Sequence, residues 1–164
     1  MSTPKPLAVT VTAVIAAAPQ TIYDLISDIP SMPRYSPETV GTSWLGTADG
    51  PVVGARFRGR NAIGRTRWST KPTITAADRG SVFAFKVPGK SGPQWTYHFE
   101  PVSGGTLVTE SMAQRTISPL LVRLLQRGAG VTDRSEHLRQ GMTITLERLA
   151  TAAAAAEAGT RAFR

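Results

Sequence analysis

The sequence predicts an α+β fold in which an antiparallel sheet packs against one long C-terminal helix. Three observations support this fold class. The first residues alternate between apolar and polar side chains, short β-like runs separated by turn residues fill the centre of the chain, and the residues after Thr132 show the period of a helix. The central connections are short, which favours antiparallel neighbours because a parallel crossover needs about a dozen residues.

The composition indicates one soluble domain. The chain has 164 residues, of which 41% are hydrophobic and 18% charged, and it has no cysteine. A chain of this length buries roughly 70% of its unfolded surface, enough for a core or for a core that encloses a cavity. The lack of cysteine excludes disulfides, zinc ribbons and thiolate nucleophiles. We predict a single domain over residues 1–164, with 1–6 and 159–164 frayed.

The first element is predicted to be a strand. Thr10 and Thr12 alternate with Val9, Val11 and Ala13, which is the period of a half-buried strand. The apolar run around them resembles a signal peptide, but this alternation favours a strand instead. Because the chain also has no charge-poor apolar run of about 18 residues or more, we expect a cytoplasmic protein without a spanning helix.

Two short helices are predicted after the first strand. Residues 20–29 place isoleucine and leucine side chains at spacings of three and four residues, and Pro19 suits the first turn of a helix. Pro30 ends this pattern. The proline-rich residues 30–37 then predict a loop or a single helical turn.

The centre of the chain predicts six further strands, and therefore a curved seven-stranded sheet. Turn signals rich in Gly, Pro, Asp and Ser separate the runs of β-prone residues. The predicted strands are Thr39–Leu45, Ala55–Asn61, Thr66–Thr75, Ser81–Val87, Gln94–Pro101 and Thr106–Gln114.

The C-terminal part predicts a long helix that begins at Thr132 or Asp133 and runs well past twenty residues. Before it, the very apolar segment Ser118–Arg127 is ended by glycines. One stripe of the long helix carries Leu138, Gly141, Met142, Thr145 and Leu149.

Several motifs follow the opening strand in a characteristic order. They are Ala18–Asp28, Met32–Pro37, Gly54–Phe57, Trp68–Thr70, Trp95–Pro101 and Gly105–Glu110, followed by the final helix. In order and spacing they resemble the START-like or SRPBCC superfamily, the polyketide cyclase/dehydrase and lipid-transport group, to about Leu149. The resemblance implies a helix-grip fold with an apolar pocket between sheet and helix for lipids, sterols or polyketides. Because the group contains cyclases, dehydratases and binding proteins, it does not choose a function.

The aromatic residues predict such a pocket independently. Odd-numbered aromatic residues at 83–85 and 95–99 share one face of two neighbouring strands, and Gly141 and Thr145 can leave space opposite them. The alternative is a filled core, because aromatic and methionine stripes usually pack. The predicted ligand-binding residues are Trp68, Phe83, Phe85, Trp95, Tyr97, Phe99, Met112, Leu138 and Met142.

Tyr97 and Glu110 are the candidates for acid–base chemistry in this pocket, where burial would raise the pKa of a carboxyl group. The strand 106–114 allows either face to point inward, and we favour a solvent-facing Glu110 paired with an arginine. His98 and His137 are isolated from each other, so neither a metal site nor a Ser–His–Asp triad is predicted.

The net charge of +8 makes anionic partners possible. Six cations and no acidic residue lie between Arg56 and Lys71, and alternation places them on the solvent face, opposite Phe57 and Trp68. We favour a solubilising surface, partly neutralised by Glu100, over anionic-lipid docking or nucleic-acid contact. A nucleic-acid reader would more typically interleave exposed aromatic residues with the cations.

The apolar segment Pro119–Leu125 has two interpretations. The simpler interpretation is a helical turn that faces the core. The other is a lid over the pocket mouth that also touches an anionic membrane when ligand transfers. The lid residues are Leu120, Leu121, Leu124 and Leu125.

The preferred function is binding or transport of a hydrophobic small molecule by a monomer or homodimer. Aromatic lining is plentiful and acid–base groups are few, which favours a carrier or sensor over an enzyme. The alternative is a polyketide cyclase or dehydratase without metal or cofactor, which requires at least two polar side chains that meet in the pocket.

Overall fold

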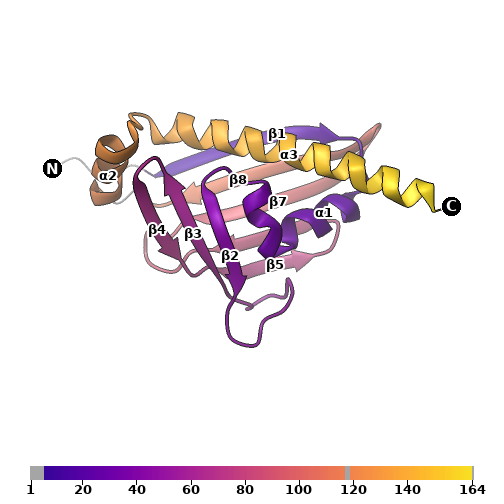
Figure 1. Ribbon diagram of the computed structural model, residues 1–164, viewed down its shortest axis with the longest axis horizontal. Coiled ribbons are helices and arrows are strands. Elements are labelled where there is room, and N and C mark those ends of the chain that lie inside the picture. The colour runs from indigo at the N-terminus through magenta and orange to yellow at the C-terminus, as the bar shows by residue number, and fades with distance from the viewer. Residues whose placement is uncertain (1–5, 117–118, 164) are drawn as a thin grey trace.

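The structure, a computed structural model, describes residues 6–116 and 119–163, and the predicted order of elements is confirmed (Figure 1). Of the predicted frayed N-terminus, residues 1–5 lie outside the described part. The elements are β1 Leu7–Ile15, α1 Pro19–Ser27, the 3-10 helix η1 Ile29–Arg34, β2 Thr39–Trp44, β3 Phe57–Ile63, β4 Thr66–Thr70, β5 Thr73–Asp78, β6 Val82–Lys86, β7 Gln94–Val102, β8 Gly105–Gln114, α2 Pro119–Ala129 and α3 Arg134–Ala162.

The described strands form two antiparallel sheets, with eight strands where the sequence predicts seven. One sheet has the order β1-β8-β7-β6-β5 and the other β2-β3-β4. The prediction of one strand over 66–75 is wrong because Pro72 divides it, since proline has no N–H for a ladder and restricts the residue before it. β4 therefore pairs with β3, and β5 pairs with β6 in the other sheet. A bridge between Arg56 and Thr73 connects the two sheets.

The long helix α3 runs along the molecule beside β1, and α1 lies against its C-terminal half (Figure 1). Its predicted N-cap is confirmed, because the Asp133 carboxylate accepts hydrogen bonds from the N–H groups of Ser135 (2.9 Å) and Glu136 (3.2 Å). α3 continues through Gly159 to Ala162, further than the sequence predicts. Its buried side chains are those of Leu138, Met142, Thr145, Leu146, Leu149 and Ala153.

The core consists of two clusters of buried side chains. The larger one surrounds α1, where the Tyr23 ring meets the rings of Phe83 and Phe99 edge to face, with centroids 6.1 and 5.9 Å apart. The smaller one joins β1 and β8 to the first turns of α3 through residues such as Met112 and Met142. Within the described residues, no helix is both long enough and apolar enough to span a membrane.

Candidate functional site

A cavity of ≈ 520 Å³ lies between the two sheets and α3. This volume lies in the range of about 300–1,000 Å³ that is typical of small-molecule sites. The three-stranded sheet, β6, β7, β8 and α3 all contribute side chains to the wall, and both core clusters border it. Seven of the nine predicted ligand-binding residues line the cavity: Trp68, Phe85, Trp95, Tyr97, Met112, Leu138 and Met142.

Phe83 and Phe99, the other two predicted lining residues, lie instead in the larger core cluster. They face inward as alternation requires, but α1 covers that end of the sheet and its Tyr23 packs against both rings. Gly141 and Thr145 of α3 do line the cavity, in agreement with the argument that small residues leave space opposite the aromatic ones.

The β6–β7 loop, residues 87–93, forms part of the cavity wall. The sequence predicts a turn in this segment but does not indicate that it lines the cavity. The loop folds back on itself, and the Gly92 N–H donates to the Gly89 carbonyl at 3.1 Å. A Cβ atom at Gly92 would lie 1.8 Å from the Val87 carbonyl oxygen, so this close approach requires glycine.

Tyr97 and Glu110 meet in the wall of the cavity. They are cross-strand partners on β7 and β8, and the Tyr97 hydroxyl donates a hydrogen bond of 2.8 Å to Glu110 Oε1. Only 2% of Glu110 is exposed, so the prediction of a solvent-facing Glu110 paired with an arginine is wrong. Burial shows that Thr106, Val108 and Met112 share the inward face of β8 with Glu110.

The environment of this pair favours its neutral forms. Burial raises the pKa of Glu110 from 4.5 to about 8, although the hydrogen bond from Tyr97 opposes the rise. Burial and the neighbouring Glu110 also raise the pKa of Tyr97 well above 10. Glu110 is therefore mostly protonated at neutral pH. Its Oε2 atom is buried and has no hydrogen-bond partner in the described part of the chain.

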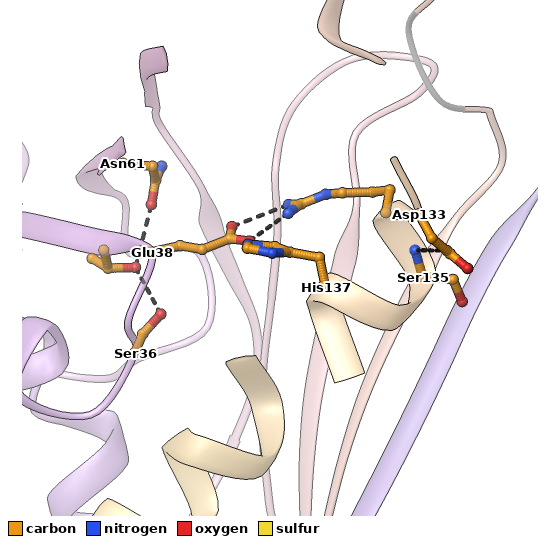
Figure 2. A network of polar contacts seen from close by, with 8 residues as sticks. Ser36, Glu38, Asn61, Asp133, Ser135 and His137 are labelled. Atoms are coloured by element: carbon orange, nitrogen blue, oxygen red, sulfur yellow. Dashed lines mark hydrogen bonds and ion pairs between the residues drawn. The ribbon is translucent and has the colours of Figure 1, made fainter. Parts of the chain in front are cut away.

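A polar network at the first turn of α3 connects that helix to the segment before β2 (Figure 2). Arg134 donates from both terminal nitrogens to the two oxygens of Glu38, with 3.0 Å between Nη2 and Oε2. His137 Nε2 lies 3.4 Å from Glu38 Oε1. Because Glu38 and Arg134 also line the cavity, this ion pair fixes α3 across one side of it.

The two histidines have different surroundings. His98 is exposed on β7, and His137 contacts Glu38. Among the described residues, no group of three or more His, Cys, Asp or Glu side chains is placed to hold a metal ion.

Three of the four predicted lid residues, Leu120, Leu124 and Leu125, do not line the cavity. α2 packs beside β3 and β4, where the Thr66 hydroxyl donates to the Leu124 carbonyl at 3.1 Å and the Arg65 N–H to the Gly128 carbonyl at 3.2 Å. Leu125 is buried, whereas Leu120 and Leu124 are 65% and 48% exposed. None of these three lines the cavity, and the side chain of the fourth, Leu121, lies outside the described part.

The cations between Arg56 and Lys71 lie on and around the β3–β4 hairpin, and all six are exposed, as predicted. Within the described residues, no Asp or Glu oxygen lies within 4.0 Å of their charged groups. The expected partial neutralisation by Glu100 is not seen, because Glu100 is on β7 in the other sheet.

Comparison with known proteins shows the family to which the chain belongs. A family model described as polyketide cyclase/dehydrase and lipid transport matches residues 6–154. The chain therefore belongs to this family, which confirms the resemblance to START-like proteins. Among curated proteins, no sequence matches the chain.

Solved structures share the fold at low sequence identity. The di-domain ARO/CYC protein StfQ from the steffimycin biosynthetic pathway is 20% identical, with a TM-score of 0.70 over 94% of this chain and 52% of that one. This chain thus spans about half of StfQ. The major latex-like protein 151 of Panax ginseng is 14% identical, with a TM-score of 0.68 over 90% and 97% of the two chains. Protein TTHA0849 of Thermus thermophilus is 18% identical, with a TM-score of 0.70 over 91% and 98%.

Proposed function

We propose that the protein binds or transports a hydrophobic small molecule, such as a lipid, sterol or polyketide-like compound. The observation that carries the proposal is the ≈ 520 Å³ cavity, whose wall includes Trp68, Phe85, Trp95, Leu138 and Met142. Small-molecule sites combine such an apolar wall with a few polar groups that orient the ligand, and here Tyr97 and Glu110 are such groups.

Two measurements test this proposal. Native mass spectrometry of protein purified without detergent should detect a bound lipid-like mass. Palmitic acid, cholesterol and anthraquinone should then be tested for a rise in melting temperature. At a ligand concentration of about 100 times Kd, this rise should be roughly 5–10 °C for a chain of this size. No bound mass and no rise with any of the three would contradict the proposal.

Two glycines of α3 offer a matched pair of variants. Gly141 lines the cavity, whereas a Cβ atom at Gly159 meets nothing within 4 Å. Gly141→Leu should therefore fill part of the cavity and reduce the ligand-induced rise in melting temperature, and Gly159→Leu should keep it. Equal responses of the two variants would place the bound molecule outside this cavity.

A second candidate is an acid–base enzyme of the cyclase or dehydratase type, which the meeting of Tyr97 and Glu110 in the cavity favours. In a dehydration, Glu110 would give its proton to the departing hydroxyl group, and the resulting carboxylate would accept the proton from the neighbouring carbon. A pKa near 8 suits both steps close to neutral pH.

The dehydration of a β-hydroxyketone, followed by the absorbance of the enone product, tests this second function. Glu110→Gln and Tyr97→Phe should abolish turnover, whereas Glu100→Gln, at an exposed position on β7, should not. If Glu110→Gln and Tyr97→Phe leave the rate of the wild-type protein unchanged, neither residue is catalytic.

The cytoplasmic location, the single domain and the monomeric or dimeric state stay predictions. Cell fractionation tests the first, and limited proteolysis tests the second. Light scattering during size-exclusion chromatography tests the third.

A further inference from the structure

We infer that the ligand is a neutral molecule whose buried end carries an oxygen acceptor, and that Glu110 holds this oxygen by donating a hydrogen bond from Oε2. This inference rests on the proposed binding function and adds the chemical class of the ligand. It follows from Glu110, which lines the cavity and whose buried Oε2 atom has no hydrogen-bond partner within the described residues.

The position of the proton on Glu110 follows from the contacts of its two oxygens. Oε1 accepts the hydrogen bond from the Tyr97 hydroxyl, so a proton on the carboxyl group is placed on Oε2. Oε2 is buried and faces no acceptor in the described part of the chain. An acceptor oxygen on a bound molecule would satisfy this donor.

The groups around Glu110 keep it neutral. On β1 its neighbour is the apolar Val11, and on β7 it is Tyr97, whose raised pKa keeps the phenol protonated. The other titratable side chains that line the cavity are Glu38, Lys90 and Arg134, of which Glu38 and Arg134 pair with each other. Burial outweighs the hydrogen bond from Tyr97 and raises the pKa of Glu110 to about 8.

The same arrangement disfavours a ligand that places a carboxylate beside Glu110. Such a ligand would bring a second charged or titrating carboxyl group into an apolar site, where ionised groups are strongly disfavoured unless they are paired. A ketone, an ester or a quinone oxygen accepts the hydrogen bond without this penalty.

Acetylnaphthalene and ethylnaphthalene are a matched pair of probes, because they differ mainly by a carbonyl oxygen. Both should bind, since both are apolar, and calorimetry gives their affinities. At about pH 6.5 the wild-type protein should prefer acetylnaphthalene by roughly 5- to 150-fold, the range expected when a buried donor is left unpaired. At about pH 9.5 the preference should be lost, because ionised Glu110 has no proton to donate.

Three variants localise the effect. Glu110→Gln keeps a donor at every pH, so its preference should no longer depend on pH. Glu110→Leu should bind both probes alike, and the exposed control Glu100→Gln should match the wild-type protein. Equal affinities of the wild-type protein for the two probes, or a pH dependence that persists in Glu110→Gln, would overturn this inference and leave the proposed binding function unaffected. If neither probe binds, the proposed binding function fails, and the inference fails with it.

A different observation, on the outside of the molecule, carries a second proposal. We propose that α2 and the neighbouring β3–β4 turn dock on an anionic lipid surface. Leu120, Arg123, Leu124 and Arg127 lie at helical spacings of three and four residues, and all four are exposed. This set is the α2 face. The hydrogen bonds of Thr66 and Arg65 hold α2 beside the turn.

Charge complementarity identifies the partner as anionic. Residues 55–77 and 111–132 contain nine of the 19 Lys and Arg residues and no Asp or Glu. A lipid surface fits better than a nucleic acid because the exposed apolar groups are leucines, whereas Trp68 of the hairpin lines the cavity. Leucines can enter the acyl boundary while neighbouring arginines contact anionic headgroups.

Co-sedimentation with phosphatidylcholine vesicles, with or without about one third phosphatidylglycerol, tests this surface. The protein should bind only the anionic vesicles. Leu120→Ser with Leu124→Ser should weaken binding about tenfold or more, whereas Val52→Ser with Val53→Ser, at positions that are at least as exposed, should not. Arg123→Gln with Arg127→Gln should weaken vesicle binding roughly fivefold per arginine, whereas the control Arg34→Gln with Arg161→Gln should leave it unchanged.

The docking proposal has clear negative outcomes. Equal binding to both kinds of vesicle would show that charge does not direct it, and no binding to either would show that the surface has no lipid affinity. Unchanged binding after both leucines are replaced would remove α2 from the contact. Displacement of the vesicles by an RNA duplex at equal salt would favour a nucleic-acid partner and overturn the proposal.

Discussion

Replacing Glu110 with glutamine should make the protein more stable at neutral and alkaline pH. Glutamine has nearly the same shape, can accept the hydrogen bond from Tyr97 and never ionises. Glu110 is buried with its pKa raised from 4.5 to about 8. Between these two values the folded protein holds a proton that the unfolded chain has released, so the free energy of unfolding falls as the pH rises.

The magnitude follows from the two pKa values. Each pKa unit of difference between the folded and unfolded states is worth about 1.36 kcal/mol, so the wild-type protein should lose roughly 5 kcal/mol between about pH 4.5 and about pH 8. The contribution is fully present below about pH 4.5 and is lost as the pH approaches the folded value. Since Glu110 is 2% exposed, solvent does not screen the effect. The loss is large against a typical stability of about 5–15 kcal/mol.

Urea denaturation over a series of pH values measures this effect. The other titrating groups are the same in the wild-type protein and in Glu110→Gln, so their contributions cancel in the difference between the two unfolding free energies. This difference should be small near pH 4.5 and should grow in favour of the variant by about 1.4 kcal/mol per pH unit up to about pH 8. The exposed Glu100→Gln serves as the control.

One result would refute the reasoning. If the difference between the wild-type protein and Glu110→Gln stays constant from about pH 4.5 to about pH 8, the carboxyl group of Glu110 ionises in the folded protein as it does in the unfolded chain. It would then be a solvated carboxylate and could not act as a buried hydrogen-bond donor.

Three further predictions follow from the same structure. Tyr97→Phe removes a hydrogen bond that lowers the pKa of Glu110, so the upper end of the pH-dependent loss of stability should move to higher pH; an unmoved profile would contradict this. Gly141→Ala should raise the unfolding free energy by about 0.5–1 kcal/mol, because a Cβ atom there would lie an ordinary 3.5 Å from Pro37 Cγ; a lower melting temperature would contradict this contact. Asp133→Ala should lower the unfolding free energy by about 1 kcal/mol through loss of the N-cap, and an unchanged urea midpoint would show that the cap contributes nothing.

Features with a local signal could be predicted from the sequence. The N-cap at Asp133 and the buried stripe of α3 depend on residues a few positions apart, so periodicity and capping rules suffice. The division of the strand at Pro72 also had a local signal. Its consequence, that β4 and β5 belong to different sheets, depends on strand pairing over a longer range.

The site was predictable only in part because alternation determines a face and not a position along the strand. Phe83 and Phe85 share the inward face of β6, yet α1 covers one and the cavity borders the other. Both faces of β8 carry apolar residues, so the side of Glu110 depends on the pairing with β1 and β7. The pair of Glu38 and Arg134 joins residues 96 positions apart, and nothing local indicates it.

The stability cost of Glu110 also supports a functional role. At about pH 7 a pKa raised from 4.5 to about 8 corresponds to roughly 3 kcal/mol of lost stability, whereas methionine or leucine would bury apolar surface at the same place. Destabilising groups of this kind concentrate where function requires them. A proton on Oε2 can be donated to a ligand oxygen in a hydrogen bond or transferred to it in a reaction. Glutamine can donate a hydrogen bond but cannot transfer the proton in this way. Turnover by the wild-type protein that is lost in Glu110→Gln while binding is kept would identify an enzyme. A wild-type protein that binds ligand and leaves it unchanged would identify a carrier.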